Sequence, residues 1–157
     1  MKKQHYVNRE IIINLPRQKI FDFLKLLKNQ DKFNKWATAD KANRIEEFKG
    51  TDGTIGYIYA WSGDKSAGQG EKEIKHIVEG KRIETEIRFI KPMRITATVI
   101  MEMESLSDEQ TKVNLINEGV LKYPLNIMIP MFEKNFAKDL DVSLATLKGI
   151  LENDENT

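Results

Sequence analysis

The chain has 157 residues and no Cys, with 25 Lys or Arg against 24 Asp or Glu for a formal net charge of +1. The lack of Cys excludes disulfides, thiolate metal sites and cysteine nucleophiles, and the interleaved charges favour neither nucleic acid nor an anionic membrane as a partner. No apolar run approaches the ~18 residues of a membrane span, so we expect one cytoplasmic domain over residues 1–157.

The N-terminal part of the chain predicts a strand followed by two short helices. Residues 6–13 end in Ile11-Ile12-Ile13, a β-branched run typical of a strand. After Pro16 the spacing of apolar residues indicates an amphipathic helix, through Ile20, Phe23, Leu24 and Leu27. A second short helix is expected over residues 31–36.

The middle of the chain predicts strands alone. Alternating segments are separated by turn-like residues, and we expect strands over residues 44–48, 54–61, 69–78, 83–90, 94–103 and 112–119. The Gly-rich segment 62–68 lies between two of these strands, so it predicts a hairpin turn and not a phosphate-binding loop.

The C-terminal part predicts one long helix. Its apolar stripe recurs every three or four residues, at Phe132, Phe136, Leu140, Leu144, Leu147 and Leu151. The Met-rich segment 126–132 before it could form a flexible lid or fill the core. The predicted fold class is α+β: a curved antiparallel sheet of about six to seven strands wrapped around this helix, with two short helices after the first strand.

Three motifs extend this interpretation: Phe33-Asn34-Lys35-Trp36, Gly68-Gln69-Gly70-Glu71-Lys72-Glu73-Ile74 and Ser143-Leu144-Ala145-Thr146-Leu147-Lys148. With them the chain resembles, over nearly its whole length, the bacterial polyketide cyclase/dehydrase-like group of the START-like (SRPBCC) superfamily. The resemblance implies a helix-grip fold with a deep cavity between the sheet and the C-terminal helix. Members bind lipids, hormones or polyketides and some cyclise their substrates, so the fold selects no single function. This chain departs from the group at Lys72 and Asn117, where relatives often have apolar side chains.

A candidate ligand-binding set follows if the strands keep a regular alternation. The predicted residues are Trp36, Tyr57, Tyr59, Trp61, Lys72, Ile74, His76, Phe89, Asn117, Met128, Phe132 and Phe136. Large amphipathic rings can form the walls of an apolar pocket, and a few polar groups can orient its ligand. A one-residue bulge would reverse the faces, and an ordinary core would show the same pattern.

Three functions remain open from the sequence. The first is non-catalytic binding of a small hydrophobic molecule that is lipid-like, aromatic or polyketide-like, by a monomer or homodimer without a cofactor. The second is a cyclase or dehydrase in which Lys72 or His76 acts as acid or base and Tyr57 or Tyr59 polarises a carbonyl. The third is a co-chaperone-like interaction module. Asp40 could border the cavity mouth. Neither His has another His or a carboxylate at the spacing that a metal site needs.

Overall fold

The computed structural model describes residues 3–34, 44–63 and 68–153. Within them the strands form a single open sheet, antiparallel throughout, in the order β1-β7-β6-β5-β4-β3-β2. The strands are β1 (Gln4–Ile13), β2 (Arg44–Lys49), β3 (Ile58–Gly63), β4 (Gln69–Val78), β5 (Arg82–Lys91), β6 (Ile95–Ser107) and β7 (Gln110–Val120). The helices are α1 (Arg17–Leu24), α2 (Leu27–Gln30), the 3-10 helix η2 (Leu125–Met128) and α3 (Ile129–Asn153).

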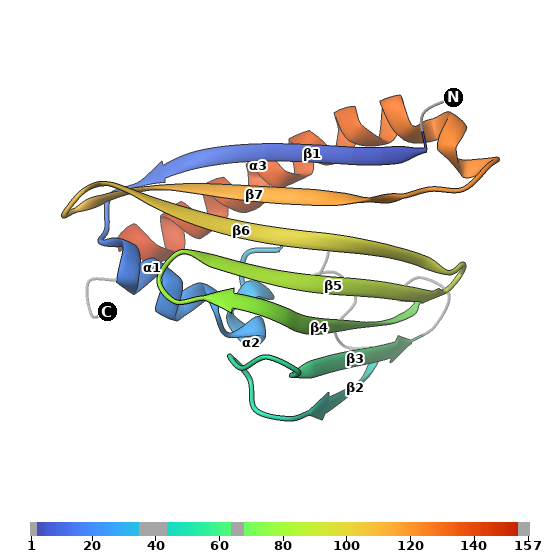
Figure 1. The fold of residues 1–157 in the computed structure, drawn as a ribbon, viewed down its shortest axis with the longest axis horizontal. Coiled ribbons are helices and arrows are strands. Elements are labelled where there is room, and N and C mark those ends of the chain that lie inside the picture. The colour runs from blue at the N-terminus through green and yellow to red at the C-terminus, as the bar shows by residue number, and fades with distance from the viewer. Residues whose placement is uncertain (1–2, 35–43, 64–67, 154–157) are drawn as a thin grey trace.

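The predicted helix-grip architecture is confirmed. The α-helices of the described residues lie on one side of the sheet, and the long α3 runs beside β1 and behind β7 (Figure 1). The apolar stripe of α3 packs into a core with α1 and the neighbouring strands, because its leucines recur on one helical face. The buried residues that α1 and α3 contribute to this core are Ile20, Phe21, Leu24, Leu140, Leu144, Leu147 and Leu151.

Polar side chains of α3 also bind the free edge of β1. The Glu133 carboxylate accepts a hydrogen bond from the backbone N–H of Tyr6 at 2.8 Å, and Glu152 accepts one from Asn14 at 2.7 Å. These backbone groups lie at an edge strand, where a sheet otherwise exposes unpaired donors. The helix therefore covers this edge of the sheet as well as its concave face.

Two predicted elements differ from the structure. The second helix is Leu27–Gln30, because the Asp52 carboxylate accepts hydrogen bonds from the N–H groups of Leu27 and Lys28 at 2.8 and 3.1 Å and so fixes its start. Of the predicted helix over 31–36, residues 31–34 are not helical and the last two lie outside the described residues. The strand expected over 54–61 begins only at Ile58, since turn residues precede it. Trp36 and Asp40 lie outside the described residues.

None of the helices in the described ranges combines the length and the apolar character needed to span a membrane.

Candidate functional site

A cavity of about 840 Å³ lies between the concave face of the sheet and the helices α3 and η2. Most of the predicted ligand-binding residues line it: Tyr59, Trp61, Lys72, Phe89, Asn117, Met128, Phe132 and Phe136. Residues from strands β3 to β7 and from two helices thus meet at one site, although they lie far apart in the sequence.

A second depression of about 660 Å³ lies apart from this cavity and is lined mainly by polar and charged side chains, among them Arg82, Glu102 and Lys112.

Two predicted residues support the cavity from the side without lining it. Tyr57 and Ile74 are 5% and 0% exposed and pack with Leu27 of α2 in a separate hydrophobic cluster. Burial raises the pKa of the Tyr57 hydroxyl, and the nearby Asp52 carboxylate adds to this. Tyr57 is therefore a neutral core side chain at physiological pH.

The expected concave position of His76 is wrong. Ile74 pairs with Thr85, whereas His76 pairs with Glu84. The pairing therefore advances by two residues along β4 and by only one along β5. Such a bulge turns the following side chains to the other face of the sheet. The His76 side chain is 69% exposed, with Nε2 at 3.6 Å from the Glu84 carboxylate and away from the cavity.

The aromatic wall depends on a glycine between two rings. Trp61, Gly70 and Phe89 are direct neighbours on β3, β4 and β5. The indole meets the Phe89 ring edge to face at 6.0 Å between centroids and stacks on Tyr59 at 6.1 Å. Offset and edge-to-face arrangements are the favourable ones for aromatic rings. These side chains form a continuous apolar surface in the cavity.

One end of the cavity contains charged groups. Lys72 Nζ lies 3.9 Å from an Asp31 carboxylate oxygen, and both side chains are only 12% exposed. Tyr59 is next to Lys72 across the strands, and its hydroxyl donates a hydrogen bond to the Glu46 carboxylate. Burial and this hydrogen bond raise the pKa of Tyr59 well above its usual value. The hydroxyl therefore remains protonated and remains a donor at neutral pH.

A second polar pair lies beside α3 and joins Asn117, a predicted ligand-binding residue, to His5, which was not predicted. His5 Nε2 donates to the Asn117 side-chain oxygen at 2.8 Å, and the two residues are 3% and 7% exposed. The His5 ring also meets Phe132 edge to face at 5.2 Å. Both His5 and Asn117 line the cavity. The alternation of His5 with Val7 along β1 was the signal for an inward position.

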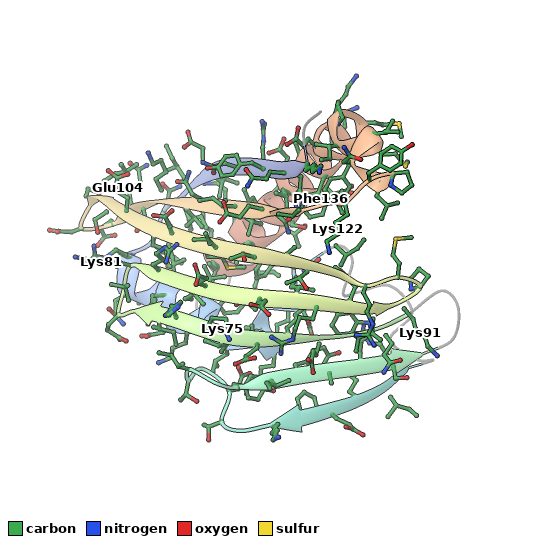
Figure 2. The ribbon with its side chains drawn as sticks, turned by 45° about the vertical axis from the view of Figure 1, so that its right-hand side comes forward. Lys75, Lys81, Lys91, Glu104, Lys122 and Phe136 are labelled. Carbon is green, nitrogen blue, oxygen red and sulfur yellow. The ribbon has the colours of Figure 1, made fainter. Side chains whose placement is uncertain are left out.

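The Met-rich segment forms the mouth of the cavity. It consists of η2 and the first turn of α3, so it is ordered helix and not a long loop. Met128 and Met131 are 52% and 55% exposed and line the cavity at the same time. Phe136, one turn beyond Phe132 on α3, is partly buried and packs against the core. Figure 2 labels it together with Lys91, the last residue of β5. Apolar side chains therefore reach from solvent into the interior.

The described residues contain no cluster of His, Cys, Asp or Glu able to hold a metal ion.

Comparisons with known proteins show the fold. The chain is similar to protein MLL2253 from Mesorhizobium loti, with a TM-score of 0.69, 14% identity and coverage of 96% of this chain and 99% of that one. Ara h 8.0201 gives a TM-score of 0.64 with 16% identity, and the Aha1 dimer from Colwellia psychrerythraea gives 0.64 with 15% identity. Coverage is 96% of this chain for both, with 99% of the first and 98% of the second.

No protein-family model matches the sequence, and a search of curated proteins finds no relative.

Proposed function

We propose that the protein binds a small, mainly hydrophobic ligand in the cavity between the sheet and α3. The observation that carries the proposal is the cavity of about 840 Å³ with aromatic side chains in its wall. Ligand sites commonly measure about 300–1,000 Å³ and combine apolar walls with a few polar groups. Apolar burial at roughly 25 cal/mol per Å² supplies the affinity, and the polar groups set the orientation.

The fold supports this function in a general way. Helix-grip proteins often bind hydrophobic ligands, and the neighbours of this chain share that fold. The motifs that resemble polyketide cyclase/dehydrase-like proteins lie at the cavity: Lys72 in one of them lines it and Gly70 supports its wall. We therefore propose that the chain belongs to that group and that its cavity-lining aromatic residues contact the ligand.

The enzymatic alternative has fewer acid or base candidates in the structure than the sequence suggested. His76 lies outside the cavity, so Lys72 is the predicted acid or base that remains beside a bound molecule. Its Nζ lies 3.9 Å from an Asp31 carboxylate oxygen, within the distance of an ion pair. An ion-paired Lys that lines the cavity can hold a polar group of a ligand, and this supports the binding function.

A titration with naphthalene, followed by Trp61 fluorescence in a Trp36→Phe background, tests the proposal. We expect saturation at one molecule per chain, because the cavity walls include Trp61 itself. The matched variant Ala97→Phe adds a ring at a small, 7% exposed residue that lines the cavity, and it should abolish binding with the fold retained. Equal binding by the two folded proteins would place the probe elsewhere and contradict the proposal.

A further inference from the structure

We infer that the ligand carries a neutral hydroxyl group on an aromatic body, and that Lys72 and Asp31 together bind that hydroxyl. The inference rests on the proposed function and adds the chemical class of the ligand. It starts from the charged end of the cavity, where these two side chains line the wall and are each 12% exposed.

The spacing of the two charged atoms matches a hydroxyl. Lys72 Nζ and Asp31 Oδ1 are 3.9 Å apart, which exceeds a direct hydrogen bond. One oxygen atom can lie about 2.8 Å from both, which is ordinary hydrogen-bond length. A hydroxyl there accepts a hydrogen bond from the ammonium and donates one to the carboxylate. A single hydroxyl group can therefore form a hydrogen bond with each of the two side chains.

A carboxylate ligand fits this end of the cavity less well. Its negative charge would approach Lys72 but would also approach the buried Asp31, and like charges repel strongly where water is scarce. Two further groups of opposite charge lie near Tyr59: Arg44 acts on it electrostatically, and Glu46 accepts a hydrogen bond from its hydroxyl. The described groups at this end thus present both signs, which favours a neutral dipole.

A purely apolar ligand fits less well for the opposite reason. It would remove water from an ammonium and a carboxylate without replacing the lost hydrogen bonds, which is costly. The wall beside Lys72 is aromatic, since Tyr59 is its cross-strand neighbour and stacks on Trp61 at 6.1 Å between centroids. A flat ring that carries the hydroxyl can stack on this wall while the hydroxyl reaches the charged pair.

Three probes with the same ring system test the inference at pH 7: naphthalene, 2-naphthol and 2-naphthoate. We expect 2-naphthol to bind roughly tenfold more tightly than either of the others, as a hydrogen-bonded pair with charged groups allows. Lys72→Met should remove the advantage of 2-naphthol over naphthalene. Asp31→Asn should shift the preference towards 2-naphthoate, because it removes the negative charge that lies 3.9 Å from Lys72 Nζ.

The control is Lys75→Met on the same strand. Lys75 is 40% exposed and pairs with Glu73 at 3.6 Å, outside the cavity lining (Figure 2). It should leave all three affinities unchanged, and thermal melting verifies the fold of every variant. If Asp31→Asn does not fold, Lys72→Met still decides the question.

The outcomes separate the two proposals. Saturable binding of naphthalene with no gain for 2-naphthol, or with tighter binding of 2-naphthoate, overturns the hydroxyl inference and leaves the proposed function standing. Failure of all three probes to bind overturns the proposed function itself.

Discussion

The indole of Trp61 on β3 lies directly against Gly70 on β4. A Cβ atom on Gly70 would be 2.6 Å from Cζ2 of Trp61 and 2.9 Å from the backbone oxygen of Arg88. Real Cβ contacts are never so short, so only glycine allows the ring to lie flat on the sheet. The aromatic wall of the cavity therefore depends on a residue that has no side chain.

Gly70→Ala should move the indole and lower the free energy of unfolding by about 1–3 kcal/mol, the usual cost of overpacking. The Trp61 emission and the affinity for naphthalene should change with it. Gly149→Ala in α3 is the matched control, because a Cβ there meets nothing within 4 Å. It should stabilise the protein by roughly 0.5–1 kcal/mol through helix propensity. An unchanged melting temperature for Gly70→Ala would refute the packing argument.

Asn117→Leu should destabilise the protein by about 1–3 kcal/mol, because the buried His5 Nε2–H loses its acceptor. Adding His5→Leu should recover part of that loss, since no unsatisfied donor then remains. Chemical denaturation of the two single variants and the double variant gives the coupling energy. Strictly additive effects would mean that the 2.8 Å hydrogen bond contributes nothing.

Met128→Lys should weaken naphthalene binding by roughly threefold or more, because it replaces apolar surface at the cavity mouth with a charge. The stability should change by less than about 0.5 kcal/mol, as for most exposed positions. Ile127→Lys is the control. Ile127 is the neighbour of Met128 in η2, is 56% exposed and does not line the cavity. Unfolding of Met128→Lys would show instead that this segment fills the core.

Glu152 should make the stability depend on acid pH. Its carboxylate accepts hydrogen bonds from Asn14 N–H and Lys148 Nζ, and these lower its pKa below 4.5. The contribution is therefore complete above pH 4.5 and is lost as the pH falls through the lower folded-state pKa.

Glu152→Gln should cost up to about 1 kcal/mol at pH 7, a modest value because the side chain is partly exposed. Below the folded-state pKa the variant and the parent should have equal stability, and denaturation curves at several pH values measure this. Glu102→Gln, at an exposed residue of β6, is the control. A difference between variant and parent that stayed constant down to pH 2 would contradict the assignment.

Regular periodicity explains what the sequence predicted well. The leucine spacing of α3 and the alternation along β3 to β7 are local patterns, and both report one buried face directly. From these the open sheet wrapped on a long helix follows, as does the inward position of Tyr59, Trp61 and Lys72.

Long-range and irregular features explain what it missed. The bulge after Ile74 turns His76 outward, and no residue type at that point signals an extra residue. Asp52 starts α2 from about 25 residues further along the chain, through two hydrogen bonds that no local motif reveals. His5 contacts Asn117 because β1 pairs with β7, and these are the first and last of the described strands in chain order.

The most direct measurement is NMR of the methionine methyl groups during a titration with naphthalene. Met101, Met128 and Met131 line the cavity, whereas Met103 is buried in the core and does not. We predict saturable shifts, complete at one equivalent, for the three cavity methyls and none for Met103. Shifts confined to other methionines, or shifts that grow without saturation, would contradict a ligand site between the sheet and α3.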